Sequence, residues 1–437
     1  MKQHINTFSV AKARTNFLSL FRKLERSCSL NIACTIALVL TMLAPQAFAQ
    51  EETDTTKVEH YIGVIPDDAF VKSGEFTGAI KVPGTKGSFK VGGMVQVNAN
   101  FDFDNQGFQQ IGVPPSIPLD EDPEDEDQQF GIHTRLSQLN FDYRSPTKVG
   151  NLRIFIEFDM FGNGNTGEFT NDYTARLRHA GVELGDWRFG QYHSAFVDLF
   201  SMPEGADAES PLAAPVLRQP AIVYMRGGNH EGSHWGFGIE NPAFEYSGSD
   251  DQYRSEAMPN FIGFGRLERS WGYVRLAGLF MQLRSAAEEV YTGGFNFSGR
   301  INLPLWHDKD NFSFATQFGE GFVHYYSSFV DVGGLDGHIA DNGDIEATGI
   351  FGAFITYQHW WSDRVRSTFM ASVFELDSPE LVNGLLYSGG ERYTVNLFWS
   401  PVDVAAFGLE YNYQTLETAD GTEGKGTRLD FVGRFFF

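Results

Sequence analysis

Cysteine is nearly absent from this 437-residue sequence, and its two copies, Cys28 and Cys34, both fall within residues 1–49. We predict that this segment is a cleaved secretory signal, so that the exported chain has no thiol for disulfides or cysteine-based metal sites. The lack of cysteine suits an oxidising compartment, where stray thiols would mispair. It excludes a disulfide-stabilised scaffold.

The predicted signal has a basic lead-in, an apolar run and a small-residue ending. Lysine and arginine dominate residues 2–26, the run LNIACTIALVLTML follows, and AFA at 47–49 precedes the expected cleavage before Gln50. A retained membrane helix is the alternative, but the run is short for about 30 Å of hydrocarbon. The lead-in is unusually long, which leaves the true start codon open.

Beyond residue 49 the sequence also lacks long apolar runs and positive charge. No stretch approaches the roughly 18 apolar residues of a membrane-spanning helix. Over the whole chain 33 Lys and Arg face 56 Asp and Glu, and removing the six basic residues and one acid of the signal lowers the net charge from −23 to −28. Such a charge excludes nucleic acid as a partner. The helix criterion does not detect membrane-spanning strands, however.

Phenylalanine, by contrast, is abundant, with 41 copies, and apolar and polar residues alternate along long stretches such as SFKVGGMVQVNANFDF and NLRIFIEFDMF. Alternation with a period of two predicts strands, and these are long beside the five or six residues usual in soluble sandwiches. We predict sixteen strands. They lie at 88–103, 130–144, 151–161, 174–184, 187–192, 218–226, 234–242, 259–268, 271–283, 293–303, 311–323, 347–360, 365–376, 391–399, 404–414 and 427–437.

Short and long connections alternate between these strands. Turn-rich segments such as LGD, ERS and WSDR take turns with longer acidic or Gly/Asn-rich ones, such as the segment containing LDEDPEDEDQ. This alternation is typical of a transmembrane antiparallel β-barrel of the bacterial outer membrane, with short periplasmic turns and long extracellular loops. A soluble β-sandwich or solenoid is the alternative, but such proteins rarely expose so many phenylalanines.

The last ten residues, RLDFVGRFFF, fit a strand that closes the barrel. Phe431, Phe435 and Phe437 share one face, which we predict to face lipid, with Phe437 at the periplasmic interface where aromatic residues collect. We interpret these three residues as a signal for the barrel assembly machinery.

Three stretches carry a family resemblance: GEFTGAIKVPGTKGSFKVGGMVQVNANFDF, SQLNFDYRSPTKVGNLRIFIEFDMFG and YTARLRHAGVELGDWRFGQYHSAFVDLFSMPE. Together they span about residues 75–205 and resemble the DcaP-like family of trimeric outer-membrane porins. The resemblance implies a sixteen-stranded diffusion porin that forms a homotrimer and favours small anionic solutes. Family members often carry a periplasmic coiled coil, but residues 50–73 have no heptads. We predict a periplasmic extension at 50–87 and a barrel domain at 88–437.

The resemblance also implies that the third outside loop folds inward and narrows the lumen. In this sequence that loop is 193–217, which contains FVDLFSMPEGADAESPLAAP. We predict that Asp198, Glu204 and Asp207 are acids of this constriction loop. An ordinary exposed loop is the alternative.

Several arginines on predicted strands oppose apolar neighbours and are predicted to line the pore. They are Arg153, Arg176, Arg178, Arg188 and Arg275. Lipid-facing arginine costs about 2–4 kcal/mol at mid-bilayer, so these side chains are expected in the lumen or near an interface. On adjacent strands they would form a ladder that grips a carboxylate bidentately. Glu157 and Asp159 on the same inner face are the alternative partners, in which case the ladder braces the wall.

Neither catalysis nor a cofactor is expected. The histidines are isolated, and His133, His179 and His193 are interpreted as structural residues near the lumen. The sequence has no GxSxG or phosphate-cradling loop, and no EF-hand spacing that would define a metal site.

We therefore predict an outer-membrane porin of a Gram-negative bacterium that passes small hydrophilic solutes, with a preference for organic anions such as dicarboxylates. Expected partners are these solutes, outer-membrane lipid and lipopolysaccharide, with divalent cations at the acidic loops, and two further copies of the chain. The alternatives are a closed-lumen barrel for surface binding or adhesion and a barrel-embedded hydrolase.

Overall fold

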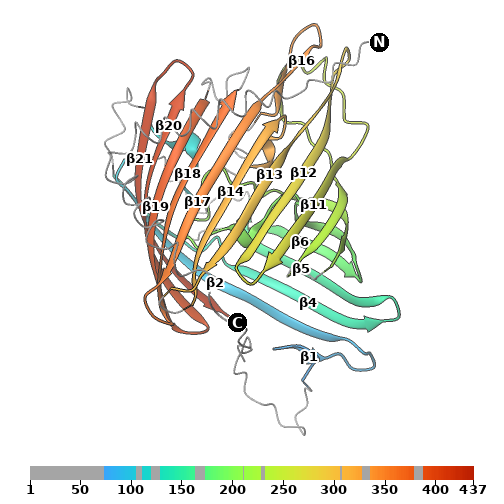
Figure 1. The fold of residues 1–437 in the computed structure, drawn as a ribbon, viewed down its shortest axis with the longest axis vertical. Coiled ribbons are helices and arrows are strands. Elements are labelled where there is room, and N and C mark those ends of the chain that lie inside the picture. Colours follow the sequence, from blue (N-terminus) through green and yellow to red (C-terminus); the bar gives the residue numbers. More distant parts are fainter. Residues whose placement is uncertain are drawn as a thin grey trace. The chain divides into compact units, whose positions relative to one another are not determined.

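Antiparallel strands close into a barrel in the computed structural model (Figure 1). The structure describes residues 73–104, 111–119, 128–162, 173–209, 211–227, 232–305, 308–326, 335–377 and 387–437, all within one unit, His60–Phe437. The wall elements are β2 (Ser88–Asp102), β3 (Gln129–His133), β4 (Gln138–Thr147), β5 (Gly150–Gly162), β6 (Thr174–Leu184), β7 (Trp187–His193), β8 (Arg218–Arg226), β9 (His234–Glu240), β11 (Asn260–Arg269), β12 (Gly272–Arg284), β13 (Glu289–Leu303), β14 (Asp310–Glu320), β17 (Gly349–Trp360), β18 (Val365–Asp377), β19 (Tyr387–Val402), β20 (Ala405–Thr418) and β21 (Glu423–Phe436). β21 pairs with β2 and closes the ring.

Two of these elements, β3 and β4, form a single interrupted strand, because both pair with the same edge of β2. The wall therefore has sixteen strands, and the predicted fold class is confirmed. The sequence predicted one continuous strand at 130–144, but the structure breaks it at a turn, where Ser137 N donates to Thr134 O. The Ser137 hydroxyl also bonds to both backbone groups of Gln96, so a local side chain replaces the ladder there.

The wall has an apolar outer face and a polar inner face, as the period-two pattern predicted. On β2, Val91 and Val95 are 47% and 48% exposed, whereas Asn98, Asn100 and Asp102 are at most 2% exposed. Phe431, Phe435 and Phe437 are exposed on the outer side of the barrel near its closing seam. Their role in assembly stays a prediction.

The two ends of the barrel differ. Connections at one end are tight turns, and those at the other include the long loops L1 (103–128), L3 (194–217), L4 (241–259) and L6 (321–348). Every tryptophan in the described part of the chain lies at the turn end. In porin-type barrels short turns are periplasmic and aromatic girdles mark the interfaces, so this end is the periplasmic one.

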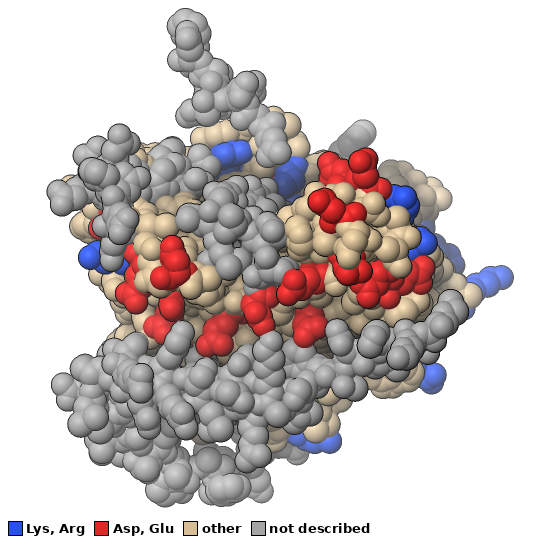
Figure 2. Space-filling view, turned by 90° about the horizontal axis from the view of Figure 1, so that it is seen from above, with Lys and Arg blue, Asp and Glu red and all other residues tan. Residues whose placement is uncertain are grey.

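L4 and L6 together form a small sheet that the sequence did not predict. β10 (Tyr246–Gly248) pairs with β15 (Gly337–Ile339), which pairs with β16 (Ile345–Ala347). Strands of three residues carry too few alternations to be recognised in a sequence. Seen from above, Figure 2 shows Asp and Glu residues gathered across this end of the molecule, as the acidic loop sequences implied.

The other described elements are short. β1 (Ile80–Lys81) pairs with the start of β2, and three 3-10 helices lie in loops: η1 (Pro114–Ser116), η2 (Leu199–Ser201) and η3 (Val323–Tyr325). Among the described residues, no helix has the length and apolar character needed to cross a membrane. The predicted signal and most of the predicted extension lie outside the described residues.

Candidate functional site

The third outside loop, L3, runs inside the barrel. Its Phe196 and Leu212 are fully buried, and its polar contacts are with inward-facing residues of the wall. Ser194 N donates to Leu217 O at 2.9 Å, so the two ends of the loop leave the wall side by side. Val216 N donates to Tyr325 O of L6 at 3.0 Å, which joins the two loops in the lumen.

The first half of L3 is attached to β12 and β13 through Asp198. Its carboxylate accepts hydrogen bonds from the hydroxyls of Tyr273 at 3.0 Å and Ser298 at 2.7 Å. The Arg275 guanidinium donates to the carbonyl of Phe196, at 3.3 Å, and to that of Ala195. Arg275 is therefore a loop-holding residue here; of the other predicted arginines, Arg188 lines the same cavity.

The middle of L3 is attached to β18 and β21. Glu204 accepts two hydrogen bonds from the Arg366 guanidinium, both at 2.5 Å, in the bidentate geometry that favours arginine over lysine. Arg434 donates to the carbonyl of the next residue, Gly205, at 2.6 Å. The second predicted loop acid thus points at the wall as well.

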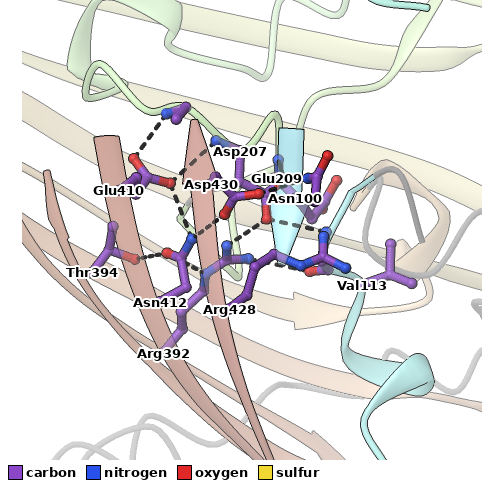
Figure 3. Close-up of polar contacts among 12 residues, drawn as sticks. Asn100, Val113, Asp207, Glu209, Arg392, Thr394, Glu410, Asn412, Arg428 and Asp430 are labelled. Atoms are coloured by element: carbon purple, nitrogen blue, oxygen red, sulfur yellow. Dashed lines mark hydrogen bonds and ion pairs between the residues drawn. The ribbon is translucent and has the colours of Figure 1, made fainter. Parts of the chain in front are cut away.

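The third loop acid, Asp207, sits in a buried ion pair (Figure 3). Its carboxylate lies 2.5 Å from Arg392 Nη2 of β19 and accepts from Gly112 N of L1, while Asp207 N donates to Glu410 of β20. Burial opposes ionisation, but Arg392 and Arg428 outweigh it and hold the pKa of Asp207 below its usual value. This carboxylate is ionised at neutral pH and anchors L3 and L1 together.

The wall beneath Asp207 carries a continuous polar network, which Figure 3 also shows. Arg428 binds Asp102 through two hydrogen bonds, at 2.6 and 3.0 Å. Asp430 accepts instead from two amides, Asn100 at 2.6 Å and Asn412 at 2.8 Å. These residues were not predicted as site residues from the sequence. Arg428 and Asp430 could have been found, because they alternate with outward-facing phenylalanines on β21.

The predicted arginine ladder on β6 is paired with the acids of β5. Arg176 makes two hydrogen bonds to Asp159, at 3.0 and 2.7 Å, and Arg178 donates to Glu157 at 2.7 Å and to Asp159 at 2.9 Å. Both pairs lie on the inner face, as the alternation predicted. This arrangement corresponds to the bracing alternative, since each guanidinium already has a carboxylate.

Arg153 is paired in the same way. Its guanidinium binds Asp142 of β4, at 3.0 Å, and lies 3.5 Å from Glu183 of β6. Arg144 contacts the same Asp142 carboxylate at 2.7 Å. The wall from β4 to β6 is thus a row of alternating charges rather than a row of free cations.

Arg188 on β7 and Arg218 at the start of β8 differ from these residues. Within the described ranges, neither has a carboxylate at ion-pair distance; Arg188 stacks on Tyr192, 4.8 Å from the ring centroid. Arg218 is close enough to Arg178 and Arg176 to be repelled by both, and it is attracted by Asp159 and Glu157. Sequence reasoning missed Arg218, because the PVLRQP context places it where a loop meets a strand, and no alternation surrounds it.

A cavity of about 120 Å³ lies where L3 approaches β7. Its lining includes Arg188, His193, Arg266 and Arg275, together with the acids Glu183, Asp186 and Asp198. Asp198 is hydrogen-bonded to the wall and Glu183 lies 3.5 Å from Arg153, so this space holds guanidinium groups beside carboxylates that already have partners. It has the charge and the donor groups to hold a small anion.

The three predicted histidines lie at the inner wall. His133 on β3 is 3% exposed. His179 and His193 have ring centroids 5.2 Å apart, and His193 Nδ1 lies 3.2 Å from Val216 O, so it helps hold the end of L3. The described residues contain no group of three or more His, Cys, Asp or Glu placed to hold a metal ion.

L6 contains a buried histidine–carboxylate contact, and its carboxylate also joins L6 to L4. His324 Nδ1 lies 2.7 Å from Asp336 Oδ2, and Asp336 also accepts from the backbone N of Glu245 at 2.9 Å. Burial would lower the pKa of His324, but Asp336 outweighs it and raises that pKa above its ordinary value, with Glu245 and Glu240 adding to the effect. The charged form of His324 is thus stabilised by folding.

This contact makes the stability of the L4–L6 cap pH-dependent. A raised pKa means that the stabilisation is complete below about pH 6.5, the unfolded histidine value, and is lost as pH rises through the folded pKa. We expect corrected hydrogen-exchange rates at 335–348 to rise as the pH is raised above about 6.5, because a charged hydrogen bond worth about 1.5–3 kcal/mol is lost. In His324→Gln this pH dependence should disappear; an unchanged dependence would assign it to other groups.

A sixteen-stranded barrel with a loop folded into its polar lumen defines a porin-type outer-membrane protein. The resemblance noted in the sequence is confirmed, since residues 72–226 match the family model described as DcaP outer membrane protein. None of the curated protein sequences compared with the chain matches it.

Solved structures share the fold. The outer membrane channel DcaP of Acinetobacter baumannii has a TM-score of 0.70 at 17% identity, with 82% of this chain and 99% of that chain covered. The anion-selective porin from Comamonas acidovorans has a TM-score of 0.52 at 10% identity, covering 80% and 100%. Salmonella typhi OmpF has a TM-score of 0.51 at 8% identity, covering 80% and 98%. At these identities the likeness establishes the fold.

Proposed function

We propose that this chain is an outer-membrane porin through which small hydrophilic solutes diffuse, with a preference for small organic anions such as dicarboxylates. One contrast carries the proposal. The three loop acids Asp198, Glu204 and Asp207 are all bonded to the wall, whereas Arg188 and Arg218 on the other side of L3 have no carboxylate at ion-pair distance in the described ranges. The net field beside the loop is therefore positive.

The charge balance of the neighbouring wall also supports a preference for anions. Six arginines of β4 to β8 face four carboxylates there, all four of which contact or oppose an arginine. Those arginines are Arg144, Arg153, Arg176, Arg178, Arg188 and Arg218, and the acids are Asp142, Glu157, Asp159 and Glu183. The acidity of the whole chain does not oppose this, because many acidic side chains lie on the loop end rather than in the lumen (Figure 2).

The related structures fit this function. One is described as an outer membrane channel and another as an anion-selective porin. We further propose that the mature chain, exported by removal of residues 1–49, forms a homotrimer in the outer membrane of a Gram-negative bacterium. Its acidic loops would face lipopolysaccharide and divalent cations.

A closed-lumen binding barrel is the second candidate, and one observation favours it. L3 and L6 bring a large apolar cluster into the barrel, in which Phe196, Phe322, Tyr325 and Tyr326 are fully buried. Such a cluster occupies part of the lumen. In a closed barrel, the acidic loops would be the part that binds a partner.

Electrical recording distinguishes the two functions. We expect the refolded wild-type protein to produce stepwise conductance in planar bilayers, with a zero-current potential of the sign of anion preference under a salt gradient. A dicarboxylate should reduce the current more than a monocarboxylate at the same concentration, because two guanidinium groups can bind it. A folded, inserted protein without conductance would favour the closed barrel.

A further inference from the structure

The outer wall of the barrel carries a groove at its periplasmic end, across β9, β11, β12 and β13. Its volume is about 430 Å³, and the residues that line it are mostly apolar. We define the groove by Trp235, Gly265, Leu267, Val274, Leu276 and Phe297. It lies outside the lumen, and no part of the channel mechanism uses it.

The groove exists because the central strand has no side chains there. Gly263 and Gly265 of β11 face outward, and a Cβ added to either would meet no atom within 4 Å. In register, Gly265 lies opposite Trp235 of β9 and Leu276 of β12, both 53% exposed. The bare backbone is therefore the floor, and these large side chains are the sides.

The dimensions suit one hydrocarbon chain. Adjacent strands lie about 4.8 Å apart, so β9 and β12 are about 10 Å apart across β11. After the half-widths of the flanking side chains are subtracted, the remaining gap is roughly as wide as one hydrocarbon chain. A protein interface, in contrast, buries roughly 1,000 Å² or more and requires a broad surface rather than a strip one strand wide.

The periplasmic mouth of the groove is cationic. Arg226 ends β8, lies in register with Trp235 and is exposed, and its guanidinium has no hydrogen bond or ion pair with any described residue. Across the groove, Arg269 Nη1 lies 3.5 Å from the hydroxyl of Ser233, which lines the groove. The nearby Glu268 is already paired with Arg266 at 2.7 Å. Two guanidinium groups therefore lie at the level of the lipid headgroups, while the Ser233 hydroxyl is already bonded to the backbone of Glu268.

We propose that this groove binds one phospholipid of the periplasmic leaflet. An acyl chain lies over Gly263 and Gly265, and the phosphate lies between Arg226 and Arg269. Charge complementarity at the mouth selects an anionic headgroup, and the apolar strip packs against the acyl chain. The proposal rests on the membrane-spanning barrel and does not require that the lumen conducts.

Native mass spectrometry of the full chain tests the proposal. The protein is taken from nanodiscs containing phosphatidylethanolamine and phosphatidylglycerol into mild detergent, and retained phospholipids are counted; titration with phosphatidylglycerol then gives an affinity. We expect one phospholipid to be retained by the wild type. Gly265→Leu, which fills the floor, and the double variant Arg226→Gln/Arg269→Gln should each weaken binding about tenfold.

Arg364→Gln is the matched control, because Arg364 is an exposed arginine in another periplasmic turn, near the exposed Trp361. Its retained lipid should equal that of the wild type. Equal retention by all variants would overturn the proposal. So would a change in oligomer mass in Gly265→Leu with unchanged lipid, which would assign the groove to a second copy. The arginine variant keeps the test decisive if Gly265→Leu does not fold.

Discussion

Replacing Arg392 with methionine should destabilise the barrel and raise its single-channel conductance. The change removes the only arginine at ion-pair distance from Asp207 among the described residues, and both side chains are at most 1% exposed. An uncompensated buried charge costs about 3–5 kcal/mol. Since Asp207 also holds Gly112 of L1, both inward segments lose an anchor. Unfolding in detergent, followed by heat-dependent gel mobility, and bilayer recording measure the two effects.

Two comparison variants separate this effect from a general loss of charge. Asp207→Asn/Arg392→Gln removes both charges together and should recover most of the stability, because replacing a whole buried pair is often nearly neutral. Lys309→Gln breaks an exposed pair with Asp363, at 2.8 Å, and should cost less than about 1 kcal/mol. If Arg392→Met unfolds and conducts like the wild type, L3 is held by its other contacts.

Reversing the charges of Arg188 and Arg218 should abolish or invert the proposed anion preference. Both guanidinium groups lie beside L3 without a carboxylate at ion-pair distance in the described ranges, so their field acts on passing ions. A charge about 4 Å from an ion is worth up to 4 kcal/mol near a protein surface, and salt screening reduces this. We expect Arg188→Glu/Arg218→Glu to lower the anion-to-cation permeability ratio at least tenfold, seen as a shifted zero-current potential.

The control keeps the same change in net charge away from the lumen. Arg254→Glu/Arg364→Glu alters two exposed arginines, one in L4 and one in a periplasmic turn, and should leave the potential nearly unchanged. Raising the salt concentration should reduce the effect of the lumen variant, as screening requires. An identical potential in wild type and Arg188→Glu/Arg218→Glu would remove these residues from any account of selectivity.

The wall of the barrel could be predicted from the sequence because its determinant is local. Successive side chains of a strand face opposite sides, so the alternation in β2 or β5 already separates the lipid face from the lumen. The interruption between β3 and β4 was missed, since it depends on the Ser137 hydroxyl meeting Gln96, 41 residues away. The three-residue strands of the L4–L6 sheet were missed because so short a stretch has no periodicity.

The partners of the charged residues were not predictable in the same way. The sequence placed Arg176, Arg178, Glu157 and Asp159 on the inner face but left open whether the arginines select solutes or brace the wall. The spacing on β5 and β6 decides which carboxylate each guanidinium reaches. For Arg275 the decision comes from L3, whose carbonyls take its hydrogen bonds. Arg218 was overlooked because nothing in its neighbourhood alternates.

The sequence by itself determined the apolar and polar faces of the strands, the order of turns and loops, and hence the closed barrel. These features follow from whether each successive side chain faces lipid or water. Only the tertiary structure decided that L3 and L6 lie inside the barrel, which charges are paired, and where glycines leave a groove on the outer wall. Those features depend on contacts between residues far apart in the sequence, 185 positions for Asp207 with Arg392 and 326 for Asp102 with Arg428, and no local pattern encodes such contacts.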